Sequence, residues 1–207
     1  SLRFALSPAT LDPRPDSETL IDAAVRWASR NAVKDRPLRL LDLGTGSGCL
    51  LLALLTELPK AHGVGIDVSP DALATARRNA ASLGLGDRAG FAEHSFTDDL
   101  GSLGDFDVIL SNPPYIPTGE IDGLAMEVKY FDPTLALDGG VDGMACWTRL
   151  LPRLAAALAV NGVAFVEIGC GQENVVTAEA EKVNLQLRDS YCDVAGITRC
   201  LAFSIKM

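Results

Sequence analysis

The sequence predicts an α/β fold with a mostly parallel, seven-stranded sheet that ends in an antiparallel hairpin. Short apolar runs alternate with helical runs between about residues 38 and 184, the pattern of parallel strands joined by helices. The last two apolar runs follow each other without a helix long enough for a crossover, so they should pair antiparallel.

Hydrophobic periodicity divides the chain into individual elements. Strands are expected at residues 38–43, 64–68, 89–93, 106–110, 162–168, 185–191 and 198–205. Helices are expected at about 16–31, at 49–58, from 69 onward, at 145–160 and at 173–183. The helix that begins at Ser69 has a serine cap, then a proline and an acidic residue, which is a typical helix start.

One domain should cover residues 1–207, with a leader at 1–15 and an irregular insertion at 116–143. Long irregular insertions in compact domains are usually functional loops, so we expect the insertion on the substrate side of a site. The chain opens on Ser1 without a methionine, which favours either a disordered leader or a chain cut from a longer one.

The charge balance opposes a nucleic-acid substrate. Asp and Glu number 27 against 18 Lys and Arg, whereas a general nucleic-acid binder needs clustered cations. Five separated cysteines without a C-x-x-C pair support neither a zinc site nor a disulfide framework, so no metal is expected. Without a signal peptide or an apolar run of membrane-spanning length, we expect a reduced, cytoplasmic monomer without membrane contact.

A glycine-rich loop follows the first predicted strand. Its residues are Gly44, Thr45, Gly46, Ser47 and Gly48. Glycines here let the backbone approach a ligand closely, and the spacing G-x-G-x-G differs from the dinucleotide fingerprint G-x-G-x-x-G. Asp67 ends the second strand 21 residues after Gly46, where a carboxylate can bind ribose hydroxyls. Asp42, at the same mouth, could attract a positive charge or bind loop amides.

These residues resemble the seven-strand S-adenosylmethionine-dependent methyltransferases, with their Rossmann-like class I fold. The resemblance implies S-adenosyl-L-methionine as cofactor and S-adenosyl-L-homocysteine as product. Residues 44–48 would wrap the methionine portion, Asp67 would hold the ribose, and Phe96 would flank the adenine. Phe96 could instead be an ordinary core residue.

The segment Ser111-Asn112-Pro113-Pro114-Tyr115 follows the fourth strand on the same carboxyl edge of the sheet. A planar NH₂ nitrogen is a poor nucleophile because its lone pair is delocalised. Two acceptors, the Asn112 side-chain oxygen and the Pro113 carbonyl, can bind its hydrogens and orient it. Proline stiffness holds the loop, and Tyr115 offers a ring to stack on the planar group.

We therefore expect Asn112, Pro113 and Tyr115 to be catalytic, and Pro114 to join them in binding the substrate. Asn112 should also contact the cofactor. The resemblance implies that the tetrad Asn112-Pro113-Pro114-Tyr115 is shared by methyltransferases that act on adenine N6, cytosine N4 or glutamine N5. Residues outside the tetrad must therefore distinguish among these three substrates.

Four separated segments resemble the HemK/PrmC family, which methylates glutamine in release factors. Residues 131–143 are similar to its E-P-x-x-A-L-D-G-G-x-D-G segment, and residues 13–18 to its P-R-P-[ED]-T-E segment. Residues 167–169 with Gln172, and residues 195–199, resemble its closing segments. Three positions depart from the pattern: Asp132 replaces Glu, Ser17 replaces Thr, and Ser95 stands where an acid usually precedes Phe96.

The resemblance implies methyl transfer to the side-chain amide N5 of the glutamine in the GGQ motif of peptide chain release factors. The family's small helical N-terminal domain, which helps to grip the release factor, has no counterpart in these 207 residues.

Three alternatives stay open. A ribosomal-protein glutamine methyltransferase shares the tetrad and much of the insertion. An adenine N6 methyltransferase is opposed by the acidic charge and by residues 131–143. A non-catalytic binding module would require decay of the glycine loop or tetrad, and both are intact. We expect His62 and His94 to be ordinary strand-end residues.

Overall fold

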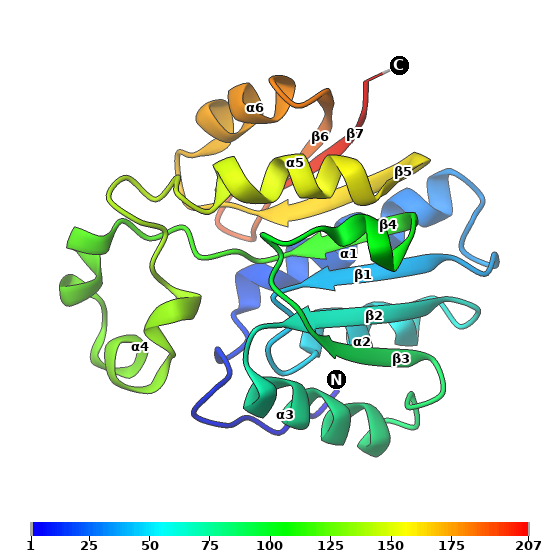
Figure 1. Cartoon of the computed structure of the whole chain (residues 1–207), viewed down its shortest axis with the longest axis horizontal. Coiled ribbons are helices and arrows are strands. Elements are labelled where there is room, and N and C mark those ends of the chain that lie inside the picture. Colours follow the sequence, from blue (N-terminus) through cyan, green and yellow to red (C-terminus); the bar gives the residue numbers. More distant parts are fainter. Residues whose placement is uncertain (1, 207) are drawn as a thin grey trace.

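The protein is described by a computed structural model over residues 2–206, in which helices cover both faces of a single sheet (Figure 1). The strands are β1 (Arg39–Leu43), β2 (His62–Asp67), β3 (Ala89–Glu93), β4 (Phe106–Ser111), β5 (Leu158–Glu167), β6 (Leu185–Cys192) and β7 (Thr198–Ile205). The α-helices are α1 (Glu18–Arg30), α2 (Cys49–Glu57), α3 (Pro70–Ser82), α4 (Met126–Phe131), α5 (Trp147–Ala157) and α6 (Glu173–Glu181). Short 3₁₀ turns are η1 (Pro15–Ser17), η2 (Leu100–Leu103), η3 (Thr118–Gly123) and η4 (Thr134–Ala136).

The strand order is β3-β2-β1-β4-β5-β7-β6. The first five strands of that order run parallel, and β7 pairs antiparallel with both β5 and β6. The predicted sheet and its antiparallel hairpin are thus confirmed. Successive strands are added toward one edge of the sheet up to β3 and toward the other edge from β4 onward, so β1 and β4 flank a topological switch point. Ligands of open α/β sheets bind beside such a point, at the carboxyl ends of the strands.

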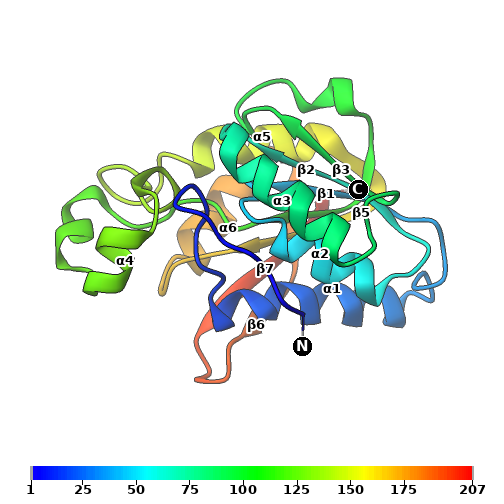
Figure 2. The same ribbon diagram turned by 90° about the horizontal axis from the view of Figure 1, so that it is seen from below.

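Two hydrophobic cores cover the two faces of the sheet. Along each strand successive side chains point to opposite faces, so Leu40 enters the core beneath α1 and α2 while Leu41 enters the core beneath α5 and α6. Figure 2 shows α1, α2 and α3 on one side of the strands and α5 on the other. Buried polar residues at or near the carboxyl ends of strands include Asp42, Ser111 and Glu167.

The expected helix at 145–160 is too long at both ends. The helix α5 covers Trp147–Ala157, and Leu158 already has extended backbone angles (φ −82°, ψ 128°). Leu158 pairs with Phe106, after which the register shifts so that Val163 pairs with Val108. The β5 strand therefore starts at Leu158, earlier than predicted. Hydrophobic periodicity assigned Leu158 and the residues up to 160 to the helix, whereas the irregular pairing with β4 places them in the strand. The short helix α4, inside the insertion, was not predicted.

The leader is extended and packed. The Ala5 backbone donates a 2.8 Å hydrogen bond to Asn79 Oδ1 of α3 and accepts a 3.0 Å bond from Asn79 Nδ2. From there it passes toward the insertion and turns back into α1 (Figures 1 and 2). Asp132 of the insertion accepts a hydrogen bond from the Asp12 N–H and forms an ion pair with Arg14. These contacts join the leader to the insertion.

Gly65 in β2 provides a test of the packing below the glycine loop. An added Cβ would lie 2.6 Å from Thr45 Oγ1 and 2.9 Å from Thr45 Cβ, and Thr45 is itself buried. We expect Gly65→Ala to lower the free energy of unfolding by about 1–3 kcal/mol, the usual cost of overpacking. Gly86→Ala is the matched control, because a Cβ there meets nothing within 4 Å. Equal denaturation midpoints for the two variants would contradict this packing.

Candidate active site

The glycine loop presents bare backbone to open space. Gly44 and Gly46 have φ values of +74° and +54°, which side chains rarely adopt. A Cβ added at either position would meet nothing within 4 Å. The loop is held from below, since the N–H groups of Gly44 and Thr45 both donate to Ile66 O at 2.9 Å. A ligand can therefore approach the loop backbone without displacing any side chain.

Asp67 holds this loop against the start of α3. Its Oδ2 accepts a 2.9 Å hydrogen bond from the Gly46 N–H, and its Oδ1 accepts one of 2.9 Å from the Ser69 N–H. Ser69 in turn caps α3 by accepting from the Ala72 N–H. A carboxylate has about four acceptor sites, so Asp67 retains capacity for ligand hydroxyls.

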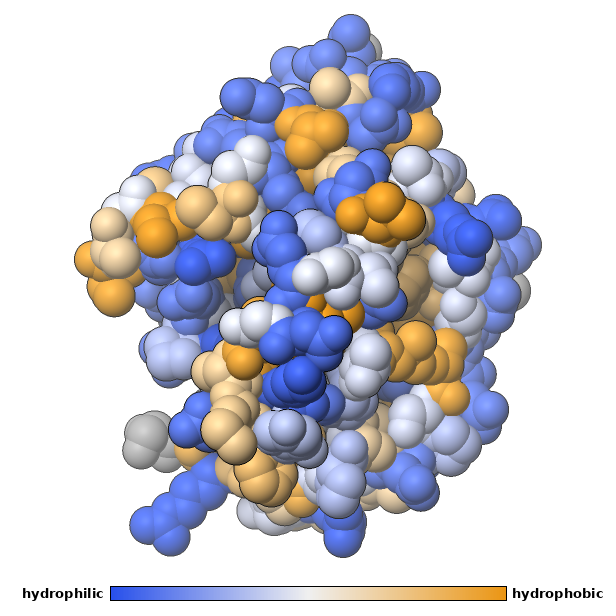
Figure 3. Space-filling model, turned by 90° about the vertical axis from the view of Figure 1, so that its left-hand side faces the viewer, coloured by the Kyte–Doolittle hydropathy of each residue, from blue (hydrophilic) through white to orange (hydrophobic). Residues whose placement is uncertain are grey.

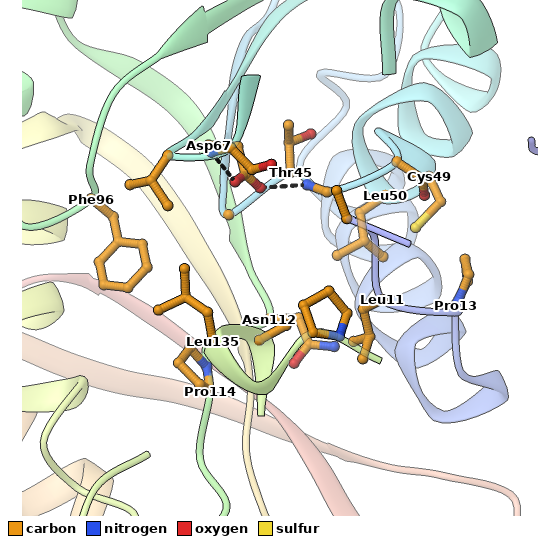
Figure 4. A pocket seen from close by; sticks show the side chains of 18 of the residues that line it. Leu11, Pro13, Thr45, Cys49, Leu50, Asp67, Phe96, Asn112, Pro114 and Leu135 are labelled. Carbon is orange, nitrogen blue, oxygen red and sulfur yellow. Dashed lines mark hydrogen bonds between the residues drawn. The ribbon is translucent and has the colours of Figure 1, made fainter. Parts of the chain in front are cut away.

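A cavity of about 360 Å³ opens beside the loop. Figure 4 shows Asp67 and Thr45 on one side, Phe96 and Leu135 on another, and Asn112 at the base. The leader residues Leu11 and Pro13 close it opposite Phe96 (Figure 4). We call this space the larger cavity, because it is larger than a second cavity beside Asn112 that is described below.

The structure brings most of the expected site residues together there. The larger cavity is lined by Gly44, Thr45, Gly46, Ser47, Asp67, Phe96, Asn112 and Pro114, all named from the sequence. His94 also lines it, although the sequence favoured an ordinary strand-end role. Its signal was its position directly after β3, on the same edge as Asp67.

Three expected residues do not line the larger cavity, and one of them, Tyr115, lines a smaller cavity described below. Gly48 lies at the start of α2, where an added Cβ would sit 3.2 Å from Ala76 Cβ and Leu52 Cδ1. Its bare backbone thus lets α2 and α3 pack closely. Pro113 is buried and lines neither cavity described here, so the expected contact of its carbonyl with the acceptor nitrogen stays a prediction.

The polar groups of the larger cavity fit an adenosyl amino acid. Asp67 can accept from ribose hydroxyls, Phe96 offers a flat apolar face, and the loop admits a chain of backbone width. Ser47 Oγ, at the cavity wall, is buried without a hydrogen-bond partner among the described residues. Such an unsatisfied group favours a polar ligand at this position.

A smaller cavity of about 190 Å³ lies on the other side of Asn112. Its walls include Arg14, Tyr115 and Glu167, together with apolar residues of the insertion such as Leu124 and Val128. Asn112 lines both cavities, so it stands where groups bound in the two spaces would meet.

A buried hydrogen-bond network surrounds Asn112. Ser17 Oγ donates to Glu167 Oε2 at 2.6 Å, and Asn112 Nδ2 donates to Ser17 Oγ at 3.2 Å. Tyr115 OH donates to Glu167 Oε1 at 3.1 Å. Burial raises the pKa of Glu167, and burial together with the Glu167 charge raises the pKa of Tyr115. The sequence singled out the segments of Ser17 and Glu167 but assigned neither residue to the site.

Gln172 and three glycines brace the backbone of Tyr115. Gln172 Nε2 donates to Tyr115 O at 3.1 Å, and its Oε1 accepts from the Gly169 N–H at 2.9 Å. A Cβ on Gly143 would lie 2.4 Å from Tyr115 O, and one on Gly139 would lie 2.8 Å from Tyr115 C. The segments whose spacing stood out in the sequence therefore meet around a single loop.

Known proteins match this chain along most of its length. Residues 34–138 match the protein family described as "Methyltransferase domain". The release factor glutamine methyltransferase of Bradyrhizobium diazoefficiens is 47% identical over 205 residues, which cover 97% of this chain and 67% of the relative. The chain belongs to the release factor glutamine methyltransferase family. The same-named protein of Rhodospirillum rubrum is 46% identical, with coverage of 96% of this chain and 59% of the relative.

The chain thus spans about two thirds or less of these relatives' length. Solved structures share the fold at lower identity. A ribosomal protein L11 methylase from Lactobacillus delbrueckii subsp. bulgaricus has a TM-score of 0.69 at 20% identity, over 98% of this chain and 84% of that chain. A methyltransferase from Pyrococcus furiosus has a TM-score of 0.65 at 17% identity, over 100% of this chain and 90% of that chain. Both support the class I methyltransferase fold.

Residues 2–206 contain neither a metal-binding cluster nor a membrane-spanning helix. No group of three or more His, Cys, Asp or Glu side chains in this part of the chain could hold a metal ion. No helix in the same range has the length and apolar character needed to cross a membrane.

Titration of Asp42 makes the free energy of unfolding of the protein depend on pH. Burial raises its pKa from 3.8 to about 6, against the opposing hydrogen bond from Thr45 Oγ1. The folded state therefore binds this proton more tightly than the unfolded state, so the free energy of unfolding falls as pH rises from about 4 to about 6. The expected loss is about 3 kcal/mol.

Asp42→Asn should abolish that loss, because the amide does not titrate. Denaturation of both proteins at several pH values isolates the contribution of Asp42 as the difference between the two curves. Parallel curves for the two proteins between pH 4 and 6 would show that the folded-state pKa of Asp42 is not raised.

Proposed function

We propose that this chain transfers a methyl group from S-adenosyl-L-methionine to the side-chain amide N5 of the glutamine in the GGQ motif of a peptide chain release factor. The observation that carries the proposal is the position of Asn112 between the two cavities, in a chain of this family. The larger cavity would hold the cofactor, and the smaller cavity would receive the glutamine.

The bound cofactor supplies an activated methyl group on a positively charged sulfur. The chain's own residues bind and orient. Asp67 would hold the ribose and Phe96 would flank the adenine. Asn112 Oδ1 and the Pro113 carbonyl would accept hydrogen bonds from the two amide hydrogens, aligning the nitrogen lone pair with the methyl carbon. Transfer of the methyl group from sulfur to this nitrogen would leave the nitrogen with one surplus proton, which would pass to solvent.

The insertion supports a protein partner. Its exposed apolar side chains are Met126, Tyr130, Phe131, Leu135 and Val141. Figure 3 looks onto this side of the molecule, where apolar groups are scattered among polar ones. The net charge of −9 disfavours a nucleic-acid substrate. A release-factor loop with glycines beside its glutamine is slim enough to reach the smaller cavity. We further propose that the enzyme is a cytoplasmic monomer.

Cofactor binding should depend on Asp67. We expect Asp67→Ala to weaken binding of S-adenosyl-L-homocysteine about 10- to 100-fold, because bonds to a charged acceptor are lost and the loop loses its support at Gly46. Asp87→Ala, at an exposed position, is the control. Isothermal titration calorimetry measures both. An affinity for Asp67→Ala equal to that of the control would remove Asp67 from the cofactor site.

The acceptor is tested by incubating the enzyme with labelled cofactor and three substrates. These are a release factor, its variant with the GGQ glutamine replaced by alanine, and an adenine-containing DNA duplex. We expect label only in the intact release factor, at the glutamine found by mass spectrometry. Label in the duplex, or equal label in both release-factor forms, would overturn the proposed substrate.

A further inference from the structure

Ser17 stands at the N-cap of α1 but makes no capping hydrogen bond with its side chain. Serine at this position usually accepts from a backbone N–H of the first helical turn, and this contributes about 1 kcal/mol. Here Ser17, a residue that is 5% exposed and lines the larger cavity, hydrogen-bonds through its hydroxyl to Glu167 and Asn112 instead. Ser17 has helical backbone angles (φ −69°, ψ −17°) because it ends the 3₁₀ turn η1, so its side chain is not placed to cap α1 and joins the network of the site.

The chemistry of the three groups fixes the direction of each hydrogen bond. The Ser17 hydroxyl donates its one hydrogen to Glu167, which is the direction that an ionised carboxylate, able only to accept, requires. Ser17 Oγ is then left with acceptor capacity alone. The side chain of Asn112 must therefore turn its NH₂ end toward Ser17, as the 3.2 Å bond from Nδ2 shows.

The opposite end of the Asn112 amide, the oxygen Oδ1, is the end that can accept a hydrogen bond from a ligand. Oδ1 accepts no hydrogen bond from the residues that the structure describes, and Asn112 lines both cavities. With the amide reversed, Nδ2 would face the acceptor nitrogen and would offer a donor where an acceptor is needed. The direction of bonding around Ser17 thus decides whether Asn112 can bind an N–H group.

We propose that Ser17 and Glu167 are positioning residues, which hold the Asn112 side chain with Oδ1 available to an N–H of the methyl-accepting nitrogen. This inference rests on the proposed function, since it concerns the same acceptor site. Glu167 also orients a second residue, because its other oxygen accepts a hydrogen bond from the Tyr115 hydroxyl. One buried carboxylate therefore orients two side chains of the Asn112–Tyr115 segment.

A purely structural role is the competing explanation. The Ser17–Glu167 bond also ties the start of α1 to the end of β5, so its loss could act through folding alone. The two explanations differ in what they change. A structural tie affects stability, whereas a positioning contact affects turnover and acts only while Asn112 is present.

The test compares Ser17→Ala, Ser17→Thr, Asn112→Ala and the double variant Ser17→Ala/Asn112→Ala, with Ser29→Ala as control. Ser29 is exposed on the same helix, and its hydroxyl donates only to Val25 O. For each protein kcat on the release factor, affinity for S-adenosyl-L-homocysteine and the unfolding midpoint are measured. Inactive but folded wild-type protein would reject the proposed function, whereas the outcomes below concern active wild type.

With the cofactor at saturating concentration, we expect Ser17→Ala to lower kcat about tenfold, and Ser17→Thr to restore kcat because the hydroxyl is retained. Asn112→Ala should lower kcat about 10²–10³-fold, and the double variant should be no slower than Asn112→Ala alone. The positioning role is overturned if the two losses multiply in the double variant, if Ser17→Ala keeps wild-type kcat, or if its loss of activity follows reduced cofactor affinity or unfolding.

Discussion

The hydrogen bond between Ser17 and Glu167 is the contact on which the hydrogen-bond network around Asn112 depends. This bond is short and buried, and it joins residues that are far apart in sequence, since Ser17 comes just before α1 and Glu167 ends β5. Buried carboxylates are costly unless their oxygens are hydrogen-bonded, and Glu167 meets that requirement with Ser17 and Tyr115. The leader residues Leu11 and Pro13, which come shortly before Ser17 in the chain, line the larger cavity.

Two rigid supports hold the site on either side of Asn112. On the cofactor side, Asp67 fixes the glycine loop through the Gly46 N–H, so the loop has its shape before any ligand arrives. On the acceptor side, Gln172 and the glycines near residue 140 hold the Tyr115 backbone. Because both supports are built from hydrogen bonds to backbone, a ligand meets a site that needs little rearrangement, which lowers the entropy lost on binding.

The sequence predicted the sheet and most of the larger cavity, because both follow from local patterns. Alternating strands and helices define a parallel sheet, and residues that follow strands collect at its carboxyl edge. The roles of Ser17 and Glu167 were not predicted, since their contact spans 150 residues and leaves no periodic trace. The helix at 145–160 was predicted too long for a similar reason. Leu158 leaves the helix to pair with Phe106, which is distant in sequence and cannot be recognised from local periodicity.

The departure from the family pattern at position 17 becomes understandable in this geometry. Serine and threonine both carry a hydroxyl on Cβ, so either can donate to Glu167 and accept from Asn112. The methyl group of threonine adds rotamer stiffness but no hydrogen-bonding capacity. What the site demands at this position is therefore one oxygen that both donates and accepts. Asp132 in place of glutamate has a comparable basis, because its carboxylate still pairs with Arg14 and binds the Asp12 N–H of the leader.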